Sequence, residues 1–149
     1  MCILQSSLAG RNARLNIEVF WSIRSQIAII LTVTTRQCEP DITVIELNGR
    51  VTLGRESGQV ETTVQKALEN GARKFVIDLA RVTYIDSTGI GIIAFCFGKI
   101  SKAGGTAHVS GAQGLVLEVF RITRLDSIIR FFPDVDAACL SLRAAGQTA

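Results

Sequence analysis

The sequence predicts one α/β domain: a mixed sheet with parallel core strands, an antiparallel hairpin at its edge, and about four helices. Two observations lead to this fold class. Strand-like apolar runs alternate with helix-like patterns along most of the chain, and short connections join them, which is typical of parallel strands covered by helices. The chain has 149 residues, enough for one domain with a substantial core.

The first part of the domain is expected to form the edge hairpin. β-Branched residues dominate residues 27–35, a short polar turn follows, and residues 42–47 form a second strand that ends at Asn48 and Gly49. Two strands joined by so short a connection favour an antiparallel pair. Residues 50–55 are expected to form a loop.

A helix is predicted over residues 56–70 and is expected to end at Gly71. Apolar residues recur there at helical spacing, and glycine is a preferred residue just past a helix end. The recurring apolar residues are Val60, Val64, Ala67 and Leu68.

The centre of the chain, residues 75–100, organises the rest. Residues 75–79 are predicted to form a buried strand because this apolar run is too short for an ordinary helix. Residues 80–85 are expected to be an irregular connection. Ser87 is expected to cap the next helix, since its hydroxyl can accept from a backbone N–H two or three residues later. The apolar residues that follow predict a largely buried helix, and a hydroxyl at a helix N-terminus is a natural seat for a phosphate.

The remaining elements complete the alternation. Residues 106–110 are predicted to form a strand and residues 128–132 the last strand. Pro133 is expected to open the final helix, because proline fits the first helical turn. Apolar stripes mark the two helices of this region: Val116, Val119 and Phe120 in the first, and Val135, Ala138, Cys139 and Leu142 in the second.

Both ends of the chain are expected to lie outside the domain, which is predicted to span residues 27–143. Residues 1–26 are interpreted as a flexible extension, or as a short element that docks Phe20 and Trp21 on the domain. Residues 144–149 are interpreted as a short tail. Polar residues interrupt the apolar runs of the extension, so neither a membrane span nor a secretory signal is expected.

Composition argues against several classes of function. The net charge is +3, and the positive excess lies before residue 37, so the domain is neutral and a nucleic-acid interface is not expected. The four cysteines are widely spaced and there is one histidine, so neither a zinc site nor a disulfide scaffold is expected. Cys96 is expected to pack as a small hydrophobe, and a reducing cytoplasm is the expected location.

Two enzyme-like motifs near the predicted helix start lack their partners. Residues 89–94 match the G-x-G-x-x-A dinucleotide pattern, but no Asp or Glu occurs between Asp86 and Glu118, where the ribose-binding acid should stand. Ser87 has no G-x-S-x-G context, and the only histidine, His108, is interpreted as a hydrogen-bonded residue at a sheet edge. No cofactor, metal or catalytic residue is therefore expected.

Asp86 and Ser87 leave two interpretations open: a plain helix start, or a phosphorylatable serine on a recognition surface. Residues 84–91, with the sequence YIDSTGIG, resemble the STAS domain family. Within that family the chain is similar to the single-domain bacterial anti-sigma factor antagonists. The likeness extends over residues 27–142 and includes the segments 102–105 and 125–129.

The resemblance implies that Ser87 is the residue phosphorylated by an anti-sigma factor with serine kinase activity. It implies partner switching: the unphosphorylated form binds the anti-sigma factor, phosphorylation breaks the complex, and a serine phosphatase restores it. The expected partner-binding residues lie around the helix start, where they should be exposed, and in the loop facing it. They are Asp86, Thr88, Gly89, Ile90, Arg50 and Thr52.

Three positions depart from the family pattern. Arg50 and Thr52 stand where the best-known antagonists carry acidic residues, which makes the surroundings of Ser87 less negative, and Arg124 stands where glycine is common. A rival interpretation is a binding subunit of a lipid-transport or larger stress-signalling assembly, because STAS domains occur in both. The retained Ser87 favours the antagonist, and no motif supports an enzyme.

Overall fold

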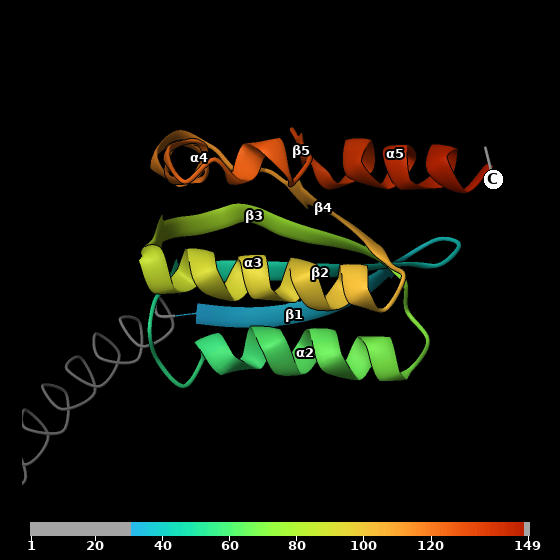
Figure 1. Cartoon of the computed structure of the whole chain (residues 1–149), viewed down its shortest axis with the longest axis horizontal. Helices are drawn as coiled ribbons and strands as arrows, with labels where there is room; N and C mark the ends of the chain where they lie inside the picture. The colour runs from blue at the N-terminus through green and yellow to red at the C-terminus, as the bar shows by residue number, and fades with distance from the viewer. Residues whose placement is uncertain (1–30, 148–149) are drawn as a thin grey trace, which may run out of the picture.

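A computed structural model describes residues 31–147 and contains one five-stranded mixed sheet (Figure 1). The strand order is β1-β2-β3-β4-β5; β1 and β2 are antiparallel and the other neighbours are parallel. The predicted fold class is confirmed. The elements in order are β1 (Leu31–Cys38), β2 (Ile42–Val51), α2 (Ser57–Glu69), β3 (Lys74–Ile85), α3 (Ser87–Lys102), β4 (Thr106–Ser110), α4 (Gly114–Ile122), the 3-10 helix η1 (Leu125–Ser127), β5 (Phe131–Phe132) and α5 (Val135–Gln147).

The sheet is buried on both faces because its central strands are apolar on both faces. Phe75, Ile77 and Leu79 of β3 point into the larger core with side chains from α2, α3 and α4. Val76 points the other way and packs with β2 and α5 residues in a second, smaller core. Alternate residues of a strand face opposite sides, so a continuous apolar run requires helices on both sides. Figure 1 shows α2 and α3 side by side, with α4 and α5 beyond β3 and β4.

The second and third strands are longer than the sequence predicted. Residues 50–51 continue β2 and residues 80–85 continue β3, so the expected loop and the expected irregular connection are wrong there. The pairing continues past two register shifts, one of them beside Gly49, whose φ is 114°. Gly49 therefore belongs to a bulge, where glycine supplies the backbone angle, and does not end the strand.

The last predicted strand is mostly wrong. Only Phe131–Phe132 is a strand; residues 128–130 form an irregular turn after η1, and Ile128 is 79% exposed. The turn into η1 places Arg124 in the left-handed region, with φ 58°. Glycine adopts that conformation without steric cost, so the glycine that the resemblance leads one to expect would fit this turn better than arginine.

Helix ends follow local capping chemistry. Gly71 has φ 94° just past α2, which confirms it as the terminator. Pro133 does not open α5. Asp134 precedes the helix instead, and its Oδ1 accepts from the Ala137 N–H at 2.8 Å, because a carboxylate at a helix start can bind an otherwise unpaired backbone donor. The stripe of Val135, Ala138, Cys139 and Leu142 packs in the smaller core, as predicted.

Several expectations concern chain ends. The interpretations of residues 1–26, and the first residues of the expected strand at 27–30, lie outside the described residues. Helix α5 runs to Gln147, so residues 144–147 of the expected tail belong to it. Within residues 31–147, no helix combines the length and the hydropathy needed to cross a bilayer.

Candidate functional site

The candidate site lies where β2 and β3 end and α3 begins. The Asp86 N–H donates to the carbonyl oxygen of Val51 at 3.3 Å, so the start of α3 is tied to the end of β2. Asp86 is extended, and its Oδ1 accepts from the Gly89 N–H at 2.8 Å. The N-cap is therefore Asp86, and the prediction that Ser87 caps the helix is wrong. Both residues are good caps, and the aspartate also complements the positive end of the helix dipole.

Ser87 is the first residue of α3 and is exposed. The neighbouring hydroxyl, on Thr88, is half-buried. Because Asp86 does the capping, the Ser87 hydroxyl is not needed for the helix start. It stands at the surface beside the free backbone N–H groups of the first turn, where negative charge is favoured.

Two of the expected partner-binding residues are structural. Gly89 is buried and Ile90 is 6% exposed, so the expectation that they are exposed is wrong. A Cβ on Gly89 would lie 2.1 Å from the Val51 carbonyl oxygen. Glycine at this position thus allows the helix start to lie against the end of β2, while the open surroundings of Gly91 impose no such requirement.

Arg50 and Tyr84 form an exposed pair beside this helix start. They are neighbours across β2 and β3, and the Arg50 guanidinium carbon lies 4.6 Å from the centre of the Tyr84 ring. Arginine over an aromatic face is a favourable cation–π contact. Thr52, next in the expected set, is half-buried, and Leu53 beyond it is 80% exposed.

Sequence reasoning missed the apolar part of this surface. Helix α3 was expected to be largely buried, but Ser87, Gly91 and Phe95 are exposed. They are spaced four residues apart and therefore share one helix face. Phe95 is 51% exposed and Lys99 lies beside its ring. The spacing could have shown that Phe95 shares a face with Ser87, and an apolar Leu53 inside a polar loop was a second available signal. We call Arg50, Leu53, Tyr84, Ser87 and Phe95 the α3 surface.

Two residues that the motif analysis set aside behave as core residues. Cys96 is fully buried, and burial raises the pKa of its thiol to about 12, which confirms its role as a small hydrophobe. His108 is 5% exposed, and burial lowers its pKa. Its ring nitrogens lie 3.0 Å from the Ala107 carbonyl oxygen and 3.4 Å from the Ser141 hydroxyl, so it is hydrogen-bonded as expected. Strand β5 pairs with β4 only at Val109 and Ser110, so His108 is paired with β3 but lies just before the residues that pair with β5.

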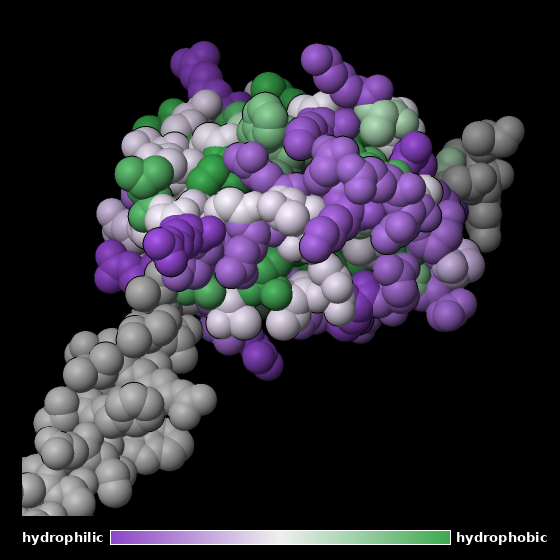
Figure 2. Space-filling view, turned by 90° about the horizontal axis from the view of Figure 1, so that it is seen from below, coloured by the Kyte–Doolittle hydropathy of each residue, from purple (hydrophilic) through white to green (hydrophobic). Residues whose placement is uncertain are grey.

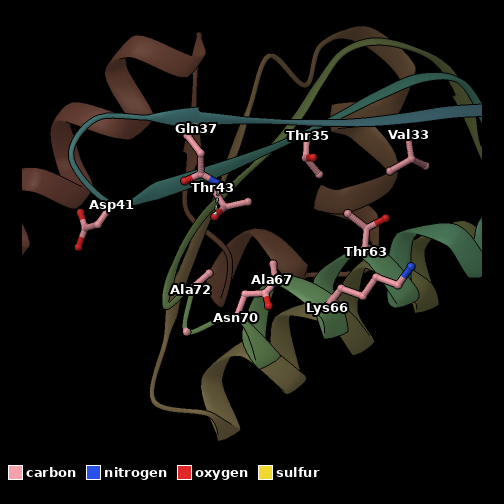
Figure 3. Close-up of a pocket in the computed structure, with 11 residues that line it drawn as sticks. Val33, Thr35, Gln37, Asp41, Thr43, Thr63, Lys66, Ala67, Asn70 and Ala72 are labelled. Atoms are coloured by element: carbon pink, nitrogen blue, oxygen red, sulfur yellow. Dashed lines mark hydrogen bonds between the residues drawn. The ribbon is translucent and has the colours of Figure 1, made fainter.

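A groove of about 560 Å³ opens between β1 and α2, away from the predicted site residues (Figure 3). Hydroxyl and amide groups line it from both walls, including Thr35 and Gln37 on β1, Thr63 on α2 and Asn70 just past the end of α2. Figure 2, which views the molecule from the α2 side, shows hydrophilic residues gathered over one part of this face and hydrophobic ones in separate patches. Among the described residues no group of three or more His, Cys, Asp or Glu is placed to hold a metal ion.

The order of elements, the mixed sheet and the serine at the start of α3 can be compared with known proteins. Residues 34–138 match the sequence profile of the STAS domain. The chain belongs to the STAS domain family. No enzymatic family is indicated for this STAS domain by the comparisons.

Solved structures with the same fold include several anti-sigma factor antagonists. An antagonist from Mycobacterium paratuberculosis has 21% identity and a TM-score of 0.66, over 76% of this chain and 94% of that one. SpoIIAA in its unphosphorylated form has 15% identity and a TM-score of 0.60, over 77% and 99%. Bacillus SpoIIAA has also been solved in its phosphorylated form, with 15% identity and a TM-score of 0.58, over 71% of this chain and 96% of that one.

The same fold also occurs in a protein of a transporter family. A sulfate transporter family protein from Wolinella succinogenes has 17% identity and a TM-score of 0.61, over 75% of this chain and 93% of that one. At identities this low the likeness shows a shared fold. The role of the STAS domain described here has to be argued from its own residues.

Proposed function

We propose that this chain is an anti-sigma factor antagonist that works by partner switching. In its unphosphorylated form it binds an anti-sigma factor with serine kinase activity through the α3 surface. Phosphorylation of Ser87 by that partner releases it, and a serine phosphatase returns it to the binding form. The proposed place of action is the cytoplasm, where sigma factors act.

One observation carries the proposal: an exposed serine occupies the first position of α3 while Asp86 does the capping. A kinase needs a reachable hydroxyl, and a switch needs a fold that tolerates the phosphate. Phosphate adds about −1.5 to −2 charge at neutral pH, and a negative charge at a helix N-terminus is favourable by about 0.3–1 kcal/mol. The phosphorylated domain should therefore stay folded.

The effect of phosphorylation must then fall on the complex. Against one partner carboxylate at about 5 Å, with an effective dielectric constant near 20, the repulsion is about 3 kcal/mol per unit charge. A loss of about 1.4 kcal/mol already lowers affinity tenfold. Leu53 and Phe95 are exposed apolar side chains of the α3 surface, and we expect the partner to pack on them next to the site where the charge is added.

The proposal is tested by titrating variants against the kinase partner. We expect Ser87→Asp to fold like the wild type and to bind at least about tenfold more weakly, for the electrostatic reason above. Ser87→Ala should bind like the wild type and should accept no phosphate. Ser101→Asp places the same charge on an exposed position in the last turn of α3 and should bind normally.

Mass mapping after incubation with the partner and ATP identifies the modified residue. Phosphate on Ser87 and on no other residue is the expected result. Equal affinity of Ser87→Asp and wild type, or phosphate found on Thr88 in place of Ser87, would refute the proposal.

A second candidate is a STAS binding subunit of a lipid-transport or stress-signalling assembly. The observation that favours it is the shared fold of the transporter family protein. In that case the α3 surface would hold one constant partner, and Ser87→Asp and Ser87→Ala would weaken the assembly to a similar degree. Genes for transporter components beside this one, with no kinase gene, would point the same way.

A further inference from the structure

Two cysteines far apart in the sequence meet at the end of the sheet opposite to Ser87. Cys38 is the last residue of β1 and is half-buried, and Cys139 lies in α5 and is buried. Both belong to the smaller core, in which Cys38 packs against the cluster that contains Ala138, Cys139 and Leu142. Cys38 therefore packs directly against the part of α5 that carries Cys139.

An arginine on the same helix as Cys139 contacts Cys38. Arg143 donates from Nη2 to the Cys38 sulfur at 3.1 Å and from Nε to the Glu39 carbonyl oxygen at 2.8 Å. Arg143 lies four residues after Cys139, so the two side chains share one face of α5 and lie one turn apart. The guanidinium that reaches the Cys38 sulfur therefore stands directly beside Cys139.

We propose that Cys38 and Cys139 form a reversible disulfide when the protein meets hydrogen peroxide. The Cys38 sulfur, as the thiolate, attacks one oxygen of hydrogen peroxide, and the O–O bond breaks. Cys38 becomes a sulfenic acid. The departing hydroxide takes up the proton that the Cys38 thiol released and leaves as one water. The Cys139 sulfur then attacks the Cys38 sulfur. The S–O bond breaks, the S–S bond forms, and the hydroxide leaves as a second water with the Cys139 proton. The two sulfurs give two electrons to the peroxide, and a dithiol reductant reverses the reaction.

The groups around each sulfur indicate that Cys38 is oxidised first and that Cys139 reacts second. Cys38 is the half-buried sulfur of the pair and Arg143 donates to it, so Cys38 is the sulfur that peroxide reaches first. Burial raises the pKa of the Cys139 thiol to about 12, and the neighbouring Cys38 adds to the rise. Arg143 and Arg36 act in the opposite direction and favour a thiolate on Cys139, which is therefore the sulfur that attacks the sulfenic acid in the second step.

The Cys38–Cys139 pair differs both from a permanent structural disulfide and from a single buried cysteine such as Cys96. In a reducing compartment a disulfide is usually transient, which fits a pair that rests as thiols. Cys96 is also buried, with its pKa raised by burial, but its neighbouring charged groups are Glu61 and Lys99, not a cysteine or an arginine. Cys96 therefore serves as the internal control.

The test exposes the reduced full-length protein to hydrogen peroxide, blocks free thiols with iodoacetamide, and maps the peptides without reduction. We expect a cross-linked peptide pair containing Cys38 and Cys139, a loss of about 2 Da from the whole protein, and full reversal by dithiothreitol. In Cys139→Ser, Cys38 should stop at the sulfenic acid and react with dimedone. In Cys38→Ser, Cys139 should stay reduced.

Arg143→Gln tests the guanidinium without touching either sulfur. Oxidation of Cys38 should slow on the order of tenfold, because the thiolate is the reactive form. The matched control is Arg121→Gln on α4, which should react like the wild type. The proposal is overturned if Cys38 pairs with Cys2 or Cys96, if it advances to a sulfinic acid with no disulfide, or if Arg143→Gln reacts at the wild-type rate. No partner protein enters this experiment, so its outcome is independent of the switch proposed at Ser87.

Discussion

Gly89 and Gly91 lie two residues apart on α3 and should respond to alanine in opposite directions. At Gly89 a Cβ would lie 2.1 Å from the Val51 carbonyl oxygen, 2.9 Å from the Val51 carbonyl carbon and 2.9 Å from Ile85 Cγ1. Two of these three atoms are backbone, so no side-chain rotation relieves the contact. The helix start must move away from β2, and the hydrogen bond from Asp86 to Val51 lengthens or breaks.

The magnitude follows from three contributions. Overpacking in a close-packed region costs about 1–3 kcal/mol, and a lost backbone hydrogen bond costs about 1 kcal/mol more. In the opposite direction, the higher helix propensity of alanine stabilises the fold by up to about 1 kcal/mol relative to glycine. Gly89→Ala should therefore lower the free energy of unfolding by about 1–3 kcal/mol. Gly91 and Gly98 have no atom within 4 Å of the added Cβ, so alanine there should raise it by about 0.5–1 kcal/mol.

Urea denaturation of the three variants, followed by circular dichroism, measures these differences. With a slope of about 1–3 kcal/mol per molar urea, the midpoint of Gly89→Ala should lie about 0.5–4 M below that of Gly91→Ala. Equal midpoints, or a more stable Gly89→Ala, would refute the claim that glycine is required for the close approach of α3 to β2.

Two further predictions concern the helix cap and a buried thiol. Asp86→Ala should lower stability by about 1 kcal/mol in urea because the Gly89 N–H loses its acceptor, whereas Asp86→Asn should keep most of it; equal losses would contradict the capping role. The pKa of Cys96 rises from 9.0 to about 12 through burial, so its contribution to stability is complete below pH 9 and is lost as the pH rises toward 12. Above pH 9 this one thiol lowers the free energy of unfolding by about 1.4 kcal/mol per pH unit. In Cys96→Ala the free energy of unfolding should therefore fall less steeply between about pH 9 and 11 than in the wild type. Parallel profiles for variant and wild type would contradict this.

The edge hairpin and the central strand could be predicted from sequence because their signals are local. The apolar run at residues 75–79 and the helical spacing of Val60 and Val64 each report burial along a single element. Gly71 was recognisable as a helix terminator for the same reason. The extension of β2 and β3 was not recognisable, because it depends on pairing across the two strands after a bulge at Gly49.

For the candidate site, too, some features could be predicted from the sequence and others could not. The segment around Ser87 marked the start of α3, and Ser87 proved to be exposed. Which residue caps the helix could not be decided, because Asp86 and Ser87 are equally good caps and the choice depends on where the end of β2 holds the chain. Gly89 and Ile90 could not be recognised as buried, since the groups that cover them, Val51 among them, come from elsewhere in the fold.

The sequence by itself determined the fold class, the order of most elements and the presence of a serine at a helix start. These follow from periodicity and from the chemistry of turns and caps, which act over a few neighbouring residues. Only the tertiary structure decided which side chains of α3 face solvent, that Arg50 lies over Tyr84, and that Cys38 packs against the cluster containing Cys139 and contacts Arg143. Each of these depends on strand register and helix packing between segments far apart in the chain, and no local pattern specifies them.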